Sequence, residues 1–450
     1  MAHFDTSGLE PAQQRLAADD IDVVRLGYAD LIGVDRGRDV LVNRLARTVS
    51  SGVAFCRSVF GTTPRGGVVD FEGGMSAGLP DVLAFPDIST LLPVPWEPGV
   101  AHCIADVFNP DGSPSQESPR YVLRQICEQF AELGLTPVVG PELEFYILEE
   151  SSDSPSGWRR YGEGTGNVYT SGRKGDPENV LLESLRQLGD YGIEVIAANH
   201  EFSSAQFEIN LWHSNALDAA DRAHRFKDAV KELARRRGHL ATFMPKPFND
   251  EGGSGYHLHF SLVDAEGRNV FDEASAEHGL SRTALHAIGG ILTHAPALAA
   301  VANPTINSYK RFGPDTLAPW LIDWGLDNRS AMVRIPPERG AASRLELRLG
   351  DASANSYLAI AGMLAAALLG IRNEIEPPAP LVGYGYDESR SEKLPQELPQ
   401  ALDALQNDKE MSDLLGEPFV NAFLAYKRDE VERFRTWITD WEFHEYTYHI

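Results

Sequence analysis

The sequence predicts an α+β fold with a small β-rich N-terminal domain and a larger domain of helices and strands. Up to about residue 110, short apolar runs alternate with turns rich in Gly and Pro, a texture typical of small sheets with long loops. Beyond that point, amphipathic helices alternate with strands whose polar faces carry charged side chains. We place the boundary near residues 105–115, at the turn NPDGSP, and expect an N-terminal helix and tail at 1–19, a first domain at 20–110 and a second at 111–450.

The first domain is expected to be mostly β-structure. Residues 9–18 have the pattern of a short helix, and 21–28 (IDVVRLGY) that of a strand. A turn from Asp30 to Gly33 connects this strand to a second one.

The second domain is expected to begin with an amphipathic helix at 118–134. Ser118 has the place of the N-cap, Pro119 the first helical position, and Gly134 the stop. A loop rich in Gly and Ser is expected at 151–175. Further helices are predicted at 178–191, 215–237, 281–300, 353–374, 398–406 and 419–440.

Four predicted strands place charged side chains on one face and large apolar side chains on the other, because successive side chains in a strand alternate. The polar faces carry Glu142 and Glu144 in 138–147, His257, His259 and Ser261 in 256–262, and Arg344, Glu346 and Arg348 in 344–349. The fourth segment, 200–211, carries Glu201 and Glu208, an odd spacing that keeps one face only if a bulge or turn intervenes at Ser203 to Gln206.

The composition of these faces predicts a divalent-metal site. Any one of them is also typical of a strand whose polar side faces water, but exposed sheet faces favour Lys and Thr, and these faces contain no lysine. Carboxylates two residues apart on one strand repel each other unless a cation lies between them. An oxygen-rich site with one imidazole suits Mg²⁺ or Mn²⁺. Arginines beside it suit phosphate, so phosphoryl transfer is favoured, although no P-loop or kinase motif is present.

Charge and cysteine content narrow the function classes. The net charge is −25, from 40 Lys and Arg against 65 Asp and Glu, which argues against nucleic acid or an anionic membrane as a partner. Cys56, Cys103 and Cys127 are widely spaced, so a reducing compartment is favoured over a disulfide framework. The N-terminus has no signal-peptide pattern, and we expect a cytoplasmic protein.

The sequence resembles the glutamine synthetase family from about residue 20 to its end. The motifs that carry the resemblance, in the family's order and spacing, are GPELEF (140–145), HEFSSAQFEIN (200–210), GGSGYHLHFSL (252–262), NSYKRF (307–312), DNRSAMVRIP (327–336) and RLELRLGDASANSYL (344–358). The resemblance implies a β-grasp N-terminal domain, a catalytic domain with a curved antiparallel sheet, and ring-based homo-oligomers, such as a dodecamer, with sites between neighbouring subunits.

The resemblance also implies roles for individual residues. Glu144, Glu201 and Glu208 match ligands of one metal, and Glu142, His257 and Glu346 match ligands of the metal that bridges the nucleotide phosphates. Residues that match nucleotide contacts are His259, Ser261 and Arg344. Residues that match the arginines around glutamate and the transferred phosphate are Arg311, Arg329, Arg334 and Arg348. The implied reaction uses ATP to convert the side-chain carboxylate of L-glutamate to an acyl phosphate, which an amine then attacks.

Two departures from the family pattern concern the amine. Ammonia-using members carry an Asp in the early loop where this chain has Cys56, and a Glu in the flap where it has Leu317. Smaller departures are Gly252, where the family has an Asn, and Ala205, where it usually has a Gly. We therefore expect a ligase for a polyamine, ethanolamine or another organic amine. The alternatives are glutamine synthetase proper, with Asp315 in place of the flap glutamate, and a non-catalytic relative.

Overall fold

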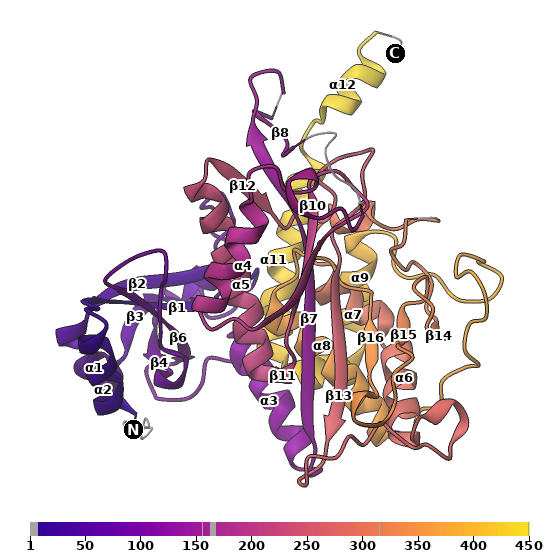
Figure 1. Cartoon of the computed structure of the whole chain (residues 1–450), viewed down its shortest axis with the longest axis horizontal. Coiled ribbons are helices and arrows are strands. Elements are labelled where there is room, and N and C mark those ends of the chain that lie inside the picture. The colour runs from indigo at the N-terminus through magenta and orange to yellow at the C-terminus, as the bar shows by residue number, and fades with distance from the viewer. Residues whose placement is uncertain (1–7, 155, 163–167, 315, 449) are drawn as a thin grey trace.

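The strands of the computed structural model form two sheets within the described residues, which are 8–154, 156–162, 168–314, 316–448 and 450. The first sheet belongs to the N-terminal part and has the order β2-β1-β6-β4-β3, with β5 paired to β6. Its strands are β1 (Val23–Ala29), β2 (Asp35–Leu41), β3 (Val53–Cys56), β4 (Asp81–Pro86), β5 (Leu92–Pro93) and β6 (Val100–Phe108). The helices α1 (Leu9–Ala18) and α2 (Leu45–Ser51) lie beside it (Figure 1). The predicted α+β architecture is confirmed.

The second sheet carries the four charged-face segments in its centre. Its order is β14-β15-β16-β13-β7-β10-β9, and β8, β11 and β12 also pair with the long strand β7. Its strands are β7 (Thr136–Glu150), β8 (Trp158–Arg160), β9 (Val195–His200), β10 (Gln206–Leu211), β11 (Ser214–Asn215), β12 (His239–Thr242), β13 (Tyr256–Val263), β14 (Trp324–Leu326), β15 (Val333–Ile335) and β16 (Leu345–Leu347). Leu143, Phe145, Leu258 and Phe260 are buried on the side opposite the charged face. The hydrophobic core beneath this sheet thus fixes which way the charged side chains point.

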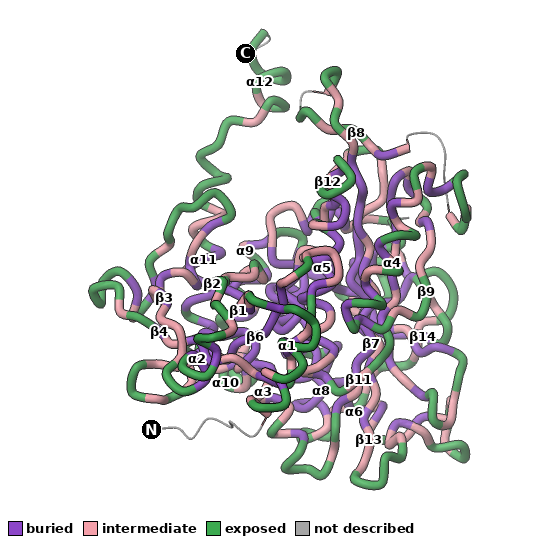
Figure 2. The backbone as a smooth tube through the Cα atoms, turned by 60° about the vertical axis from the view of Figure 1, so that its left-hand side comes forward, coloured by how far each residue is buried: buried purple, intermediate pink, exposed green. Residues whose placement is uncertain are grey.

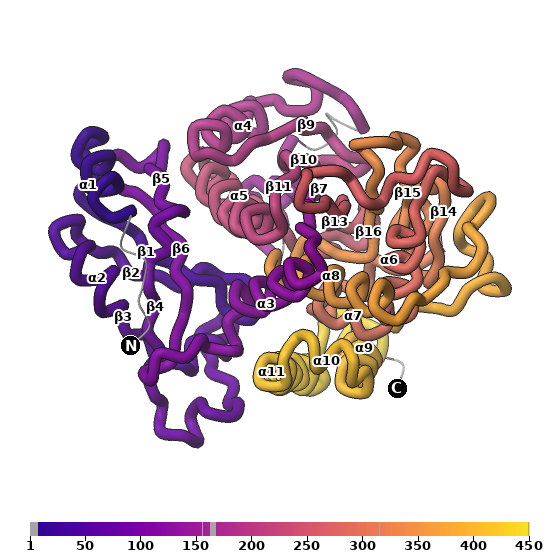
Figure 3. Tube along the Cα trace, turned by 90° about the horizontal axis from the view of Figure 1, so that it is seen from below, coloured from indigo at the N-terminus to yellow at the C-terminus, as the bar shows by residue number. Residues whose placement is uncertain are grey.

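Helices cover the apolar side of the second sheet. The central helix, α8, is buried from Ser356 to Gly370 and packs against several of the others (Figure 3). The helices are α3 (Pro119–Ala131), α4 (Val180–Asp190), α5 (Ala216–Arg236), α6 (Arg282–Thr293), α7 (Ala295–Ala302), α8 (Ser356–Arg372), α9 (Leu398–Asn407), α10 (Lys409–Leu415), α11 (Glu417–Arg435) and α12 (Asp440–Tyr446). Figures 1 and 2 show α12 projecting away from the rest of the chain, with an exposed surface.

Three predicted elements differ in the structure. The helix predicted at 281–300 is two helices, α6 and α7, bent by 75°. The bend has a local cause, because Pro296 lacks the N–H that a continuous helix needs and its ring would clash with the carbonyl one turn earlier. The helix predicted at 419–440 ends at Arg435, and the loop predicted at 151–175 contains strand β8.

The described residues contain no single helix long and apolar enough to cross a membrane. The bent pair α6 and α7 passes the same test by length and composition only, and most of its side chains are buried.

Candidate active site

The register of the second sheet brings the charged side chains of different strands into rows. Residues directly opposite each other in an antiparallel pair share a face. Glu142 on β7 lies opposite His257 on β13, and Glu144 lies opposite Glu208 on β10. On the other side of β13, His259 lies opposite Glu346 on β16. The pairing therefore gathers side chains that are up to about 200 positions apart in the chain onto one face of one sheet.

A turn between β9 and β10 brings Glu201 to the same face as Glu208. Ala205 has the left-handed φ of 64°, and the backbone N–H of Glu201 donates to the carbonyl of Gln206 at 2.8 Å. The predicted interruption near Ser203 to Gln206 is confirmed. A left-handed conformation favours glycine, which explains why the family has Gly where this chain has Ala205.

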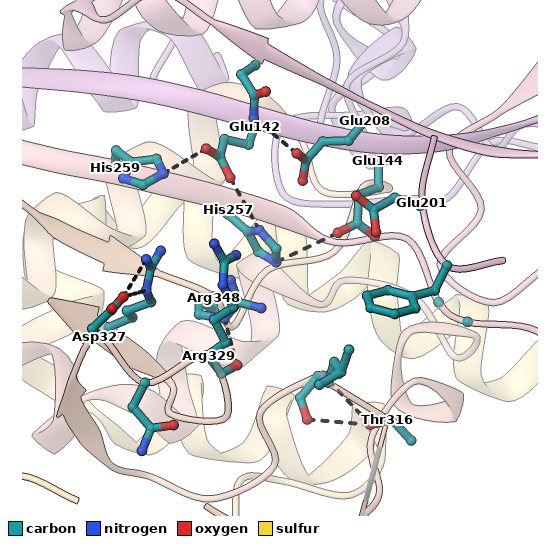
Figure 4. Close-up of a pocket in the computed structure, with 18 of the residues that line it drawn as sticks. Glu142, Glu144, Glu201, Glu208, His257, His259, Thr316, Asp327, Arg329 and Arg348 are labelled. Carbon is teal, nitrogen blue, oxygen red and sulfur yellow. Dashed lines mark hydrogen bonds and ion pairs between the residues drawn. The ribbon is translucent and has the colours of Figure 1, made fainter. Parts of the chain in front are cut away.

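The charged face forms the floor of a cavity of about 1200 Å³ (Figure 4). Predicted site residues that line it are Glu142, Glu144, Glu201, Glu208, His257, His259, Arg311, Arg329, Arg334, Arg344 and Arg348. Glu346 is buried beneath the cavity wall, and Ser261 lies further along β13 and is not part of the lining. Figure 4 shows Glu201 and Glu144 on the side of Thr316, and His259 and Asp327 toward the other side.

The donor atoms fit a divalent cation, but they cluster differently from the predicted ligand sets. Donor atoms of Glu142, Glu208 and His257 lie within 4.8 Å of one another, and so do those of Glu142, His259 and Glu346. Glu144 is drawn aside by hydrogen bonds from Gln206 Nε2 at 3.0 Å and from the backbone N–H of Gly255 at 2.7 Å. The assignment of particular ligands to particular metals therefore stays a prediction.

Burial and mutual repulsion raise the pKa values of the carboxylates on one side of the cavity. Burial raises the pKa of Glu208 to about 9, and the charges of Glu142 and Glu144 add to the rise. Burial and the charge of Glu144 raise the pKa of Glu201 to about 7. Burial and the neighbouring carboxylates thus favour the protonated forms on this side, whereas a cation bound between the carboxylates would favour their ionised forms.

On the opposite side of the cavity, hydrogen bonds and positive charges lower the pKa values of two carboxylates. Burial acts to raise the pKa of Glu142, but its attraction to His257 and His259 outweighs burial and holds that pKa well below its ordinary value. His259 Nε2 lies 2.9 Å from Glu142 Oε1. Burial also acts to raise the pKa of Glu346, but the charge of Arg348, followed by the two imidazoles, lowers it to about 2.

Arg334 and Arg348 hold Glu346 between them. Arg348 Nη1 donates to Glu346 Oε1 at 2.6 Å and Arg334 Nη1 to Glu346 Oε2 at 2.5 Å. Arg334 also donates twice to Asp327 Oδ1, at 3.1 and 2.7 Å, and Arg348 Nε donates to the carbonyl of Arg329 at 3.1 Å. These contacts preorganise guanidinium groups at the cavity wall, where oxyanions would be bound.

Arg311 is buried against a glycine-rich loop. Its Nη1 donates to the carbonyl of Gly350 at 3.3 Å, while its buried Nε has no hydrogen-bond partner among the described residues. A Cβ added at Gly253 would lie 2.3 Å from Arg311 Cγ, and one added at Gly255 would lie 2.8 Å from His257 Nε2. Glycine is therefore needed at both positions for Arg311 and His257 to approach the loop.

Three polar residues that support the site were missed in the sequence analysis. Gln206 Nε2 donates both to Glu144 and to the carbonyl of Gly253, each at 3.0 Å, and Asn199 Nδ2 donates to Glu201 at 2.7 Å. Asp327 holds Arg334. Asn199 is on β9, two residues before Glu201, so strand alternation alone could have flagged it.

The two departures that concern the amine occupy different places. Leu317 lines the cavity, with 44% of its surface exposed. Cys56 ends β3 in the first sheet and does not line the cavity of its own chain; its register partner on β4 is Asp81. Asp315, the alternative flap carboxylate, lies outside the described residues.

Gly252 also lines the cavity. Its N–H donates to Ser203 Oγ at 2.6 Å, and a Cβ there would lie 2.9 Å from that oxygen, so the larger family residue would require Ser203 to move.

Comparison with known proteins defines the class. The family description "Glutamine synthetase, catalytic domain" matches residues 116–446. The glutamine synthetase of Thermotoga maritima is 36% identical over 98% of this chain and 99% of its own length, and that of Pyrococcus horikoshii is 38% identical over 95% and 96%. A solved structure described as a GmaS/ADP complex has a TM-score of 0.87 at 33% identity and covers 97% of this chain and 99% of its own.

The fold, the site and these similarities define an ATP-dependent carbon–nitrogen ligase. The chain belongs to the glutamine synthetase family, whose members use glutamate, ATP and a nitrogen substrate. The resemblance noted in the sequence is confirmed.

Proposed function

We propose that this ligase joins the γ-carboxylate of L-glutamate to an organic amine larger than ammonia. The observation that carries the proposal is Leu317, which follows Thr316 in the chain and lines the same cavity as Glu201. An apolar side chain there cannot hold ammonium or accept its proton, but it can contact the hydrocarbon part of an alkylamine.

The wider rim of the cavity supports an amine with an apolar portion. Phe202 directly follows Glu201 and is 66% exposed in the lining, and Tyr169 is 72% exposed. Aromatic faces attract ammonium groups and pack against methylene groups, so these side chains suit an alkylammonium ligand.

In the proposed reaction, a γ-carboxylate oxygen of glutamate attacks the γ-phosphorus of ATP, and ADP leaves. The nitrogen of the free amine then attacks the acyl carbon of the γ-glutamyl phosphate, the bond from that carbon to the bridging oxygen breaks, and inorganic phosphate leaves with that oxygen and with the proton that the nitrogen loses. Arg311, Arg329, Arg334 and Arg348 bind glutamate and the transferred phosphoryl group, and His259 and Arg344 bind the nucleotide. For Ser261, outside the cavity lining, the nucleotide contact rests on the family resemblance alone.

The carboxylate cluster fits Mg²⁺ or Mn²⁺, since its donors are oxygens with imidazole and without thiolate. The residues that would hold such ions are Glu142, Glu144, Glu201, Glu208, His257 and Glu346. When bound, the ions neutralise phosphate and carboxylate charge. Glutamine synthetase proper remains the rival function, because the Thermotoga maritima and Pyrococcus horikoshii proteins of that name are 36% and 38% identical to this chain over nearly its whole length.

The test is glutamate-dependent phosphate release from ATP with ammonia and with a panel of putrescine, cadaverine, spermidine, spermine, ethanolamine and short monoamines. We expect at least one organic amine to exceed ammonia by at least about tenfold in kcat/KM, a difference of about 1.4 kcal/mol. If ammonia equals or exceeds every amine, the enzyme is a glutamine synthetase. Release with no amine at all would favour a non-ligase relative.

A further inference from the structure

A second cavity, of about 390 Å³, lies between the first sheet's loops and the helices of the catalytic part. We call it the α11 cavity, because Phe423, Tyr426 and Lys427 of α11 line it. Leu31 and Arg65 line it from the N-terminal part of the chain. None of its lining residues lines the active-site cavity, so the two are separate.

The walls of the α11 cavity are mostly apolar, with a few polar groups, as in small-molecule binding sites of this size. Leu31, Val301, Leu358, Phe423 and Tyr426 supply apolar surface, and all are buried. A ligand there would keep a hydrocarbon body out of water.

The polar groups in the α11 cavity are predominantly cationic. Arg65, Lys427 and Arg433 line it, against the single carboxylate of Glu430. Arg65 has no ion-pair partner among the described residues, and Arg433 pairs only with Asp429. In a chain with a net charge of −25, a cavity with surplus positive charge is selective for anions.

Lys427 places one of these positive charges in a buried position. Its side chain is 3% exposed, and among the described residues the only hydrogen bond of its Nζ goes to Glu430 Oε2 at 2.9 Å. An ammonium has three donors, so two remain for an acceptor in the cavity. A buried cation with unused donors, beside the aromatic ring of Tyr426 at 5.2 Å, would stabilise a carboxylate.

We infer that the α11 cavity binds a small organic carboxylate whose charged group pairs with Arg65, Lys427 and Arg433 and whose hydrocarbon body packs on the apolar walls. The site also touches Ser353 and Asn355, in the segment that follows Gly350, whose carbonyl accepts from Arg311 of the active site.

The test is calorimetric titration of the full-length protein with acetate, butyrate, hexanoate and benzoate, each matched by its neutral amide. We expect affinity to rise from acetate to hexanoate and benzoate, and the amides to bind at least about tenfold more weakly. Arg65→Gln and Arg433→Gln, both at exposed positions, should each weaken benzoate binding by at least about tenfold, whereas Arg15→Gln on α1 should not.

Arg329→Gln separates this site from the active site, which also has arginines. Benzoate binding that persists in Arg329→Gln and is lost in Arg65→Gln supports the inference. Binding that is lost in Arg329→Gln and kept in Arg65→Gln and Arg433→Gln would overturn it. Absence of binding by any of the carboxylates at low millimolar concentration would overturn it as well.

Discussion

Glu208 lies directly opposite Glu144 across the antiparallel pair β10 and β7, on the face that forms the active-site floor. Like charges in directly opposite positions destabilise a sheet. The protein nevertheless adds Glu142 and Glu201 to the same surface. The arrangement is stable in ionised form only with a cation between the carboxylates, so the sheet register is itself an argument for the proposed metal site.

The stability of the metal-free protein should fall as the pH rises from about 5 to 7, whereas above that range the lowered pKa of buried Lys227, about 7, acts in the opposite sense. The pKa of Glu208 in the folded protein is about 9, and that of Glu201 is about 7, both above the ordinary value of 4.5. Between the ordinary and the raised pKa, the folded state holds protons that the unfolded state has lost, so folding becomes less favourable as the pH rises. One such proton contributes about 1.4 kcal/mol per pH unit.

Urea denaturation in the presence of EDTA at pH 5, 6 and 7 measures this slope. Glu208→Gln should flatten it, because the amide cannot ionise, while Glu132→Gln at an exposed position should leave it unchanged. A wild-type stability that is constant or rises over this range would contradict the electrostatic account.

Removal of a single proposed metal ligand should nearly abolish turnover. We expect Glu201→Ala and His257→Ala each to lower kcat by at least about 100-fold, the scale of losing one charge-stabilising group from a preorganised site. Glu150→Ala, at the exposed end of β7, is the matched control. Near-normal activity of either site variant at saturating Mg²⁺ and Mn²⁺ would disprove the assignment.

Gln206 should act on metal affinity through Glu144. Its amide fixes Glu144 and the carbonyl of Gly253 together, so Gln206→Ala should free both. Loss of such supporting partners typically costs about 10- to 100-fold in metal affinity. Activity measured against Mn²⁺ concentration tests this; an unchanged half-saturating concentration would mean that Gln206 only fills space.

The C-terminal arm should join chains into a larger assembly. Trp437, Ile438, Trp441 and Phe443 are 66%, 76%, 64% and 60% exposed, on a segment that projects from the body (Figure 2). Contiguous exposed apolar side chains mark interaction surfaces. Light scattering should report a particle many times 49.4 kDa, and deletion of residues 437–450 should reduce its mass. A fully active monomer would refute sites shared between subunits.

The sequence predicted which side chains share one face of a strand better than it predicted which strands pair with each other. Alternation put Glu142, Glu144, His257 and His259 on polar faces, and the turn before Gln206 followed from the odd spacing of Glu201 and Glu208. Which strand pairs with which is a long-range property, so periodicity could not show that Glu208 faces Glu144.

The hydrogen bonds that support the active-site residues could not be predicted from the sequence either. Gln206 lies two residues before Glu208 on β10, so alternation could have placed it on the charged face, but its contact with Glu144 and that of Asp327 with Arg334 are reached only through tertiary structure. The position of Cys56 is a second feature that the sequence alone could not predict. The family pattern put it in the amine site, but in a single chain it lies in the first sheet, and only a neighbouring chain could bring it to a cavity.

The central claim, that an organic amine and not ammonia attacks γ-glutamyl phosphate, is tested most directly by competition. The enzyme is given glutamate, ATP and an equimolar mixture of ammonia and the best amine of the panel, and the products are quantified by mass spectrometry. The product ratio equals the ratio of the two kcat/KM values. We predict a γ-glutamyl amide in at least about tenfold excess over glutamine, and a shift toward glutamine in Leu317→Glu, which restores a carboxylate that can hold ammonium. Glutamine as the main product of the wild-type enzyme would contradict the account.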